Sequence, residues 1–263
     1  MKGIICYYSS TGNTKLACQY IAKHITSVTF DPFNIATDND LNLAAYEIIG
    51  FASSTDFMAP PFLLKQFIDK LPVQNGKLAF VFNTYGLVSG KTLTVLKNWV
   101  SAKGFKVIAG HSLQTPENYP PLIVKGIKSE QAPKLKQLNK FKDFIGELNN
   151  LLASSQSEEL EEVNLKIGII NSLSPTHPRT KARIDMGSKY IEDSLCIECG
   201  ICKSTCPYGA VELNPKPVFN MEKCYGCWSC FHHCPNKAIY TKKIRGKGHY
   251  PEPVEQLKKK FKL

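Results

Sequence analysis

Apolar runs alternate with amphipathic segments over the first 153 residues of the chain. Five runs are apolar and short enough to be strands of a covered sheet, and they are residues 3–8, 27–30, 46–52, 77–83 and 106–112. Apolar positions recur at helical spacing in four other segments, which are residues 15–25, 60–71, 91–102 and 129–153. Such alternation with short connections predicts a parallel sheet with helices on both faces. Asp31-Pro32 is expected to end the second strand.

A loop rich in hydroxyl groups separates the first predicted strand from the first predicted helix. It consists of Ser9, Ser10, Thr11, Gly12, Asn13 and Thr14. Free backbone N–H groups and the dipole of a helix that begins here would face the loop, and the hydroxyls add donors, so the sequence predicts an anion site. The alternative is plain capping of the helix by Ser or Thr, which accounts for only one or two of these hydroxyls.

The last third of the chain contains two copies of one cysteine pattern, Cys-x2-Cys-x2-Cys-x3-Cys-Pro. The second copy begins 28 residues after the first (224 − 196), and the eight cysteines are Cys196, Cys199, Cys202, Cys206, Cys224, Cys227, Cys230 and Cys234. Paired zinc sites also use Cys-x2-Cys, but zinc takes four ligands, usually as two spaced pairs. Two runs of three cysteines plus one, each followed by proline, favour iron–sulfur clusters.

These motifs carry two resemblances. Ser-x-Thr-Gly-Asn-Thr after a first strand resembles the FMN-phosphate loop of flavodoxins, and the cysteine runs resemble those of bacterial two-cluster ferredoxins. The resemblances cover roughly residues 1–150 and 186–245. They imply an α/β fold with a flavodoxin-like, doubly wound, parallel five-stranded sheet in the order 2-1-3-4-5, joined to a small α+β ferredoxin domain. The implied cofactors are FMN and two [4Fe-4S] clusters.

The ferredoxin resemblance also implies a set of ligands for each cluster, because the fourth cysteine of each run binds the cluster of the other run. One cluster would be held by Cys196, Cys199, Cys202 and Cys234. The other would be held by Cys224, Cys227, Cys230 and Cys206.

Two more loops are expected to border the flavin, because ligands of such sheets bind at the carboxyl ends of the strands. The loop after the third strand contains Ser53, Ser54, Thr55, Asp56, Phe57 and Met58, and the loop after the fourth contains Asn83, Thr84, Tyr85 and Gly86. Tyr85 resembles the aromatic residue that packs against the flavin ring in flavodoxins. Phe57 and Met58 contact the flavin or pack only within their own loop. His111 is interpreted as a structural histidine, with a flavin-facing role as the alternative.

The sequence argues against two kinds of nucleotide-binding site, the Walker loop and the Rossmann dinucleotide site. Residues 86–92 have three residues between their glycines where a Walker loop has four, and no Gly-x-Gly-x-x-Gly occurs in the chain.

The predicted organisation is a flavodoxin-like domain at 1–153, a linker at 154–185, a ferredoxin domain at 186–245 and a basic tail at 246–263. Val254, Leu257 and Phe261 would share one helical face of the tail. We expect a solvated terminal helix there, and docking to a partner or to an anionic membrane surface is the alternative.

The formal charge of +11 counts every cysteine as neutral. Thiolates around two oxidised clusters would lower it to about +7, and a flavin phosphate to about +5. A basic protein favours an acidic redox protein as its partner, and no nucleic-acid-binding motif accompanies the charge. The chain begins without a signal-peptide pattern, so a cytoplasmic location is expected. Cys6 and Cys18 are interpreted as buried apolar residues.

These features predict an electron-transfer protein that links two [4Fe-4S] clusters with FMN, and so connects one-electron with two-electron redox partners. Two alternatives remain open at this stage. One is an FMN-dependent reductase of a small acceptor that the ferredoxin domain supplies with electrons, and the other is a redox-responsive binding module without flavin.

Overall fold

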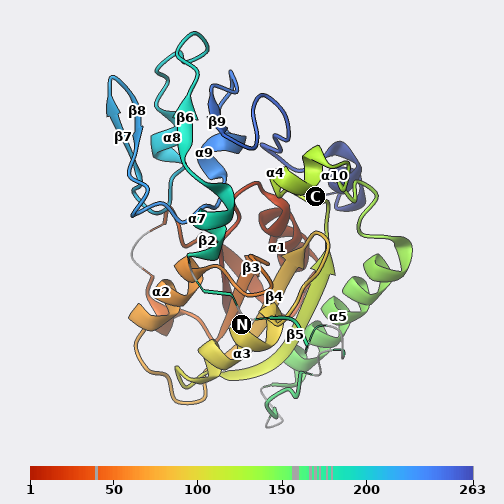
Figure 1. Ribbon diagram of the computed structural model, residues 1–263. Helices are drawn as coiled ribbons and strands as arrows, with labels where there is room; N and C mark the ends of the chain where they lie inside the picture. Colours follow the sequence, from red (N-terminus) through yellow and green to blue (C-terminus); the bar gives the residue numbers. More distant parts are fainter. Residues whose placement is uncertain are drawn as a thin grey trace.

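The first domain is a doubly wound sheet, as the sequence predicts. The computed structural model describes residues 1–38, 41–155, 160–165, 168, 171, 173–175, 177–178 and 180–262. Five parallel strands run in the order β2-β1-β3-β4-β5 (Figure 1). The strands are β1 (Lys2–Tyr7), β2 (Thr29–Asn34), β3 (Ile48–Ser54), β4 (Leu78–Tyr85) and β5 (Lys106–Gln114). The helical elements are α1 (Asn13–His24), η1 (Leu43–Ala45), α2 (Phe62–Lys70), α3 (Thr92–Ser101), α4 (Pro120–Val124) and α5 (Leu135–Ser154).

Alternate residues of each buried strand enter two separate cores, one on each face of the sheet. Ile5 packs with residues of α1 and α5, whereas Ile4 packs with residues of α2 and α3. Cys6 and Cys18 are buried in these cores, and burial raises the pKa of both thiols. Both are therefore neutral apolar residues, as predicted.

Strand β2 does not end at Asp31-Pro32, so this part of the sequence interpretation is wrong. Pro32 lies within β2 and pairs with Ile5. Strand β2 is the edge of the sheet and has one neighbour, β1. Proline is tolerated on an edge strand because its missing N–H removes no bond on the open side.

The cysteine-rich part forms a small α+β unit, which lies above the sheet in Figure 1. Its elements are α7 (Lys181–Met186), β6 (Lys189–Ile191), α8 (Ile201–Ser204), β7 (Val211–Asn214), β8 (Lys216–Phe219), α9 (Ser229–His232) and β9 (Ile239–Thr241). Strand β6 pairs with β9, and β7 pairs with β8, both antiparallel. The core combines cysteines of both runs with Met186, Trp228 and Phe231.

The C-terminal segment returns to the first domain, so the expectation of a solvated terminal helix is wrong. Helix α10 (Glu255–Lys260) buries Leu257 completely, and Phe261 behind it is equally covered. The Phe261 ring lies 4.9 Å from the Tyr20 ring of α1 and 5.8 Å from the Phe141 ring of α5. The apolar face that the sequence shows therefore covers α1 and α5.

Part of the predicted linker, residues 154–185, falls outside the described residues. Where it is described, Val163 donates its N–H to the Val107 carbonyl of β5 at 2.8 Å, and Leu165 packs near Gly110. None of the helices in the described ranges has the length and apolar character that a bilayer span requires.

Leu257→Ala is expected to lower the free energy of unfolding of the first domain by about 2–5 kcal/mol, because it removes a fully buried side chain from a packed core. Urea unfolding followed by near-UV circular dichroism measures the change. Lys259→Ala is the matched control, since Lys259 is exposed on the same helix. Equal unfolding midpoints for the two variants would contradict the docking of α10.

Candidate functional site

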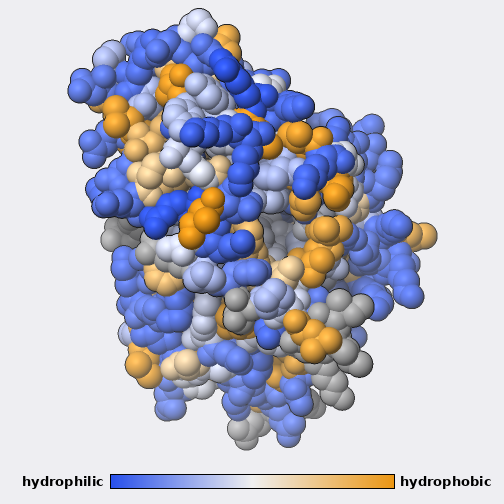
Figure 2. Space-filling view, in the orientation of Figure 1, coloured by the Kyte–Doolittle hydropathy of each residue, from blue (hydrophilic) through white to orange (hydrophobic). Residues whose placement is uncertain are grey.

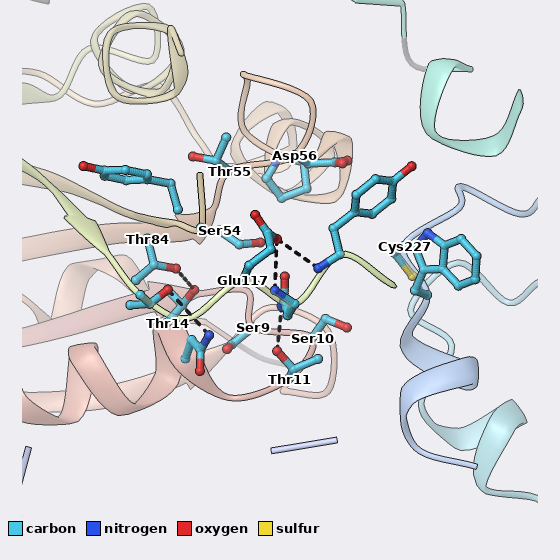
Figure 3. Close-up of a pocket in the computed structure, with 18 of the residues that line it drawn as sticks. Ser9, Ser10, Thr11, Thr14, Ser54, Thr55, Asp56, Thr84, Glu117 and Cys227 are labelled. Atoms are coloured by element: carbon cyan, nitrogen blue, oxygen red, sulfur yellow. Dashed lines mark hydrogen bonds between the residues drawn. The ribbon is translucent and has the colours of Figure 1, made fainter. Parts of the chain in front are cut away.

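A cavity of about 280 Å³ opens at the carboxyl ends of β1, β3 and β4 (Figure 3). Most of the predicted flavin-site residues line it, namely Ser9, Ser10, Thr11, Asn13, Thr14, Ser54, Thr55, Asp56, Phe57, Met58, Thr84, Tyr85 and Gly86. Ser53 and Asn83 lie behind the wall and are fully buried. Gly12 is in the loop but does not line the cavity. The three predicted loops therefore converge on one site.

The loop before α1 is shaped for an anion. Gly12 has φ +94° at the start of α1, and its N–H is bonded to Ser9 Oγ at 3.1 Å. The hydroxyl of Thr14, in the first turn of α1, is hydrogen-bonded to the hydroxyl of Thr84 in β4, with 2.8 Å between the two oxygens. Ser10 Oγ is buried and lacks a hydrogen-bond partner among the described residues. A phosphate group fits this set, because it would meet the free N–H groups of the first helical turn and a spare hydroxyl.

Asn13 has a different role from the one its place in the motif suggests. Its side-chain amide donates to the Pro116 carbonyl at 3.1 Å and accepts from the Tyr250 hydroxyl at 2.9 Å. Thr11 Oγ1 likewise accepts from Asn118 Nδ2 at 2.7 Å. The side chains of the phosphate loop thus hold the loop at 115–118, which leaves the backbone N–H of Asn13 as its group for a ligand.

The loop at 115–121 was expected to cover the cofactor, but the sequence did not single out its Glu117 as a site residue. Its buried carboxylate accepts from the N–H groups of Leu87, Asn118 and Tyr119 at 2.9–3.1 Å. Burial raises the pKa of Glu117, and the three N–H donors oppose that shift. A Cβ on Gly86 would lie 2.2 Å from Glu117 Oε2, so glycine is required there. This carboxylate fixes the loops on two sides of the cavity.

The aromatic residues of the wall are arranged edge to face. Phe57 and Met58 take left-handed backbone angles, with φ 45° and 70°. The Phe57 ring lies 5.7 Å from the Tyr119 ring at 77°. Burial raises the pKa of Asp56, beside them, to about 6.

His111 lies outside the cavity wall, in agreement with its interpretation as a structural residue. Its ring stacks with those of Phe82, Phe141 and Phe144 at 5.1–6.4 Å. Burial lowers the pKa of His111 to about 4, which keeps the ring neutral at neutral pH.

The remaining wall of the cavity comes from the cysteine-rich unit. Tyr225, Gly226, Cys227, Trp228 and His232 line it. In Figure 3, Cys227 enters from the blue, C-terminal part of the chain, across the cavity from Thr14 and Thr84. The sequence shows both motifs but not that they meet, because their contact depends on the packing of the two units.

A network of hydrogen bonds through His232, Tyr250 and Asn13 connects this wall with the phosphate loop, and we call it the ring of hydrogen bonds. His232 Nδ1 accepts from the Tyr250 N–H at 3.0 Å, and the His232 ring also contacts the Asn118 backbone. Burial lowers the pKa of His232 to about 3, so the ring is neutral and can accept. Tyr250 then reaches Asn13 through its hydroxyl. Pro253 completes the contact by packing against Gly12, where a Cβ would lie 2.8 Å from Pro253 Cδ.

The two predicted cysteine sets are spatially separate. A second cavity is lined by Cys196, Cys199, Cys202 and Cys234, the four cysteines expected to share one cluster. We call the cluster of this set the far cluster. The cluster expected between Cys206, Cys224, Cys227 and Cys230 is the near cluster, because Cys227 also lines the first cavity.

Three of the four cysteines expected to hold the near cluster interact with one lysine. Lys189 Nζ donates to Cys224 Sγ at 3.1 Å. Burial acts to lower the pKa of Lys189, but Cys230, Cys224 and Cys227 outweigh it and raise the pKa. Among the described residues, no three His, Cys, Asp or Glu side chains converge as they would on a single metal ion. A cubane cluster does not require such convergence, because each of its four thiolates binds a different iron.

Comparisons with known proteins found matches to the cysteine-rich unit. Residues 195–248 match the 4Fe-4S dicluster domain family. A ferredoxin of Pyrobaculum islandicum is 47% identical over 51 residues, which are 19% of this chain and 48% of that protein. Polyferredoxin protein MvhB of Methanothermus fervidus is 38% identical over 53 residues, which are 20% of this chain and 13% of that protein. The chain therefore spans about half, or less, of the length of these relatives.

Solved structures resemble the first domain. A flavodoxin from the domain Archaea covers 58% of this chain and 99% of its own, with a TM-score of 0.44 and 21% identity. Rubredoxin oxygen:oxidoreductase from Desulfovibrio gigas covers 60% of this chain and 37% of its own, with a TM-score of 0.45 and 18% identity. The strand order and register, and not these similarities, establish the fold. The C-terminal part of the chain is a two-cluster 4Fe-4S domain, and it is fused to a doubly wound parallel sheet in the flavodoxin order.

Proposed function

We propose that the protein passes electrons between two [4Fe-4S] clusters and a bound FMN. The observation that carries this proposal is the position of Cys227, which lines the same cavity as Ser9 and Thr14. A predicted ligand of the near cluster thus lines the cavity whose opposite wall is shaped for a flavin phosphate. A flavin bound in this cavity would lie next to the near cluster, and a short distance favours electron transfer between them.

The residues of the cavity suit FMN in both of its parts. The phosphate would bind at the start of α1, beside the spare hydroxyl of Ser10. The ring system would lie in the part lined by Phe57, Tyr85 and Tyr119. Bound FMN stores one or two electrons, whereas each cluster carries one at a time, so the pair connects one-electron with two-electron traffic.

The protein's own residues hold the clusters and bias their charge. The near-cluster thiolates have the Lys189 ammonium beside them, and a positive charge favours the more negative, reduced cluster. Cys206 and Cys234 each accept a backbone N–H, from Ala210 at 3.3 Å and Ala238 at 3.2 Å. The far-cluster set includes Cys199, the one cysteine of the eight with an exposed side chain. The far cluster therefore occupies the outer end of the path.

Anaerobic reconstitution is expected to give about one FMN and two clusters per chain, with the flavin bleached when a reduced ferredoxin is added. Flavin and iron analysis together with absorbance spectra measure this. Cys199→Ser is expected to retain FMN but to slow its reduction, because the outer end of the path is lost. Cys18→Ala, which changes a buried thiol of the first domain, is the control. A protein with full clusters and no flavin under these conditions would favour the flavin-free binding module.

Tyr250→Phe is expected to weaken FMN binding by roughly fivefold, or about 1 kcal/mol, because Asn13 Oδ1 loses its donor and the phosphate loop loses its support. Titration of the apoflavin protein, with both clusters in place, measures the dissociation constant by flavin fluorescence. Tyr240→Phe is the matched control, because it also removes a tyrosine hydroxyl but lies on β9, where the Tyr240 ring stacks on Tyr190. Equal dissociation constants for the two variants would count against a supporting role of the ring of hydrogen bonds.

A further inference from the structure

The two cysteine runs share a backbone conformation but differ in their side chains. Each run contains a left-handed residue directly after its second cysteine. In the far-cluster run this residue is Gly200, with φ +76°, at the start of α8. In the near-cluster run it is Trp228, with φ +62°, at the start of α9. The repeat thus places a tryptophan where its first copy has glycine.

Trp228 occupies this position against its own conformational preference. A bulky residue with φ above zero is strained, whereas glycine adopts that angle without cost. Crowding does not explain glycine in the first copy, since a Cβ on Gly200 would only touch Leu213 Cδ1 at 3.5 Å. An observed outlier of this kind, held in place by its surroundings, points to a function.

The surroundings of Trp228 place it at the cavity. Its side chain is 3% exposed and lines the cavity. The Trp228 ring lies 6.3 Å from the Tyr119 ring at 77°, and Tyr119 in turn meets Phe57 edge to face. Trp228 also follows Cys227, a ligand of the near cluster, directly in the chain. One residue therefore joins the near cluster to the aromatic wall of the cavity.

The same kind of difference occurs three residues earlier in the repeat. Ile197 follows the first cysteine of the far-cluster run and is 61% exposed, whereas its counterpart Tyr225 is 8% exposed and lines the cavity. The near-cluster run has thus exchanged an exposed aliphatic residue and a glycine for two aromatic residues, both of which face the cavity.

We infer that Trp228 is the residue through which the cluster domain contacts the bound flavin, so that the flavin site is formed by both domains. The inference rests on the proposed function and adds a flavin contact from outside the flavodoxin-like domain. Trp228 then has two roles, one in the affinity for FMN and one in the contact between FMN and the near cluster.

The test uses the full chain with both clusters and compares Trp228→Phe with Trp99→Phe, a partly buried tryptophan of α3 outside the cavity wall. Flavin fluorescence titration gives the dissociation constant for FMN, and the visible absorption bands and midpoint potential of the flavin report its contacts. Trp228→Phe is expected to raise the dissociation constant about tenfold and to shift the bands and the potential. Trp99→Phe is expected to leave all three unchanged.

Trp228→Gly provides a second variant, because glycine is the residue that the first copy of the repeat accepts at this backbone angle. Iron content is expected to remain at two clusters per chain, while FMN affinity falls further than in Trp228→Phe. Unchanged affinity, bands and potential in both variants would overturn the inference and leave the proposed function intact. Failure of the unsubstituted protein to bind FMN would instead overturn the proposed function.

Discussion

The arrangement of the molecule depends on the hydrogen bonds that fix the cluster domain against the phosphate loop. His232 lies between two predicted cluster ligands in the sequence and accepts the N–H of Tyr250, and the hydroxyl of Tyr250 reaches Asn13 at the start of α1. Every donor and acceptor of this ring is buried or nearly so, which makes each bond costly to leave unmade. The ring closes only when α9, the C-terminal segment and the phosphate loop are all in place. Docking of the cluster domain and shaping of the cavity thus depend on the same hydrogen bonds.

The C-terminal segment connects the cluster domain to the core of the first domain and so stabilises this docking. Leu257 and Phe261 anchor it in the core that contains Tyr20 and Phe141, and that core would hold the segment even if the ring of hydrogen bonds opened. Between the anchor and the cluster domain, Pro253 crosses directly over Gly12. Hydrophobic burial therefore provides the affinity of the contact, while the directional bonds of Tyr250 set its register.

Much of the fold and the chemistry of the site could be predicted from the sequence, because both are written in local patterns. The strands are short apolar runs, and the cysteines of each run lie within a few residues of one another in the sequence. Strand β2 was predicted to end at Pro32 because the pattern does not show that β2 is an edge strand. The partners of Phe261 and of Glu117 were also hidden, since Tyr20 lies 241 residues before Phe261 (261 − 20) and Leu87 lies 30 residues before Glu117. Contacts of that kind depend on packing and leave no periodic signal.

The internal repeat shows how one backbone serves two purposes. In the far-cluster run Ile197 is open to solvent, whereas in the near-cluster run Tyr225 and Trp228 are buried against the cavity. Both runs have a left-handed residue directly after the second cysteine, so the difference between them lies in their side chains and in what each run packs against. A duplicated sequence therefore gives a cluster pair with distinct ends: one end is enclosed by the flavodoxin-like domain, and the other presents Cys199 at the surface. On the proposed function, this asymmetry sets the order of the sites along the electron path, with the surface cluster at one end, the flavin at the other and the enclosed cluster between them.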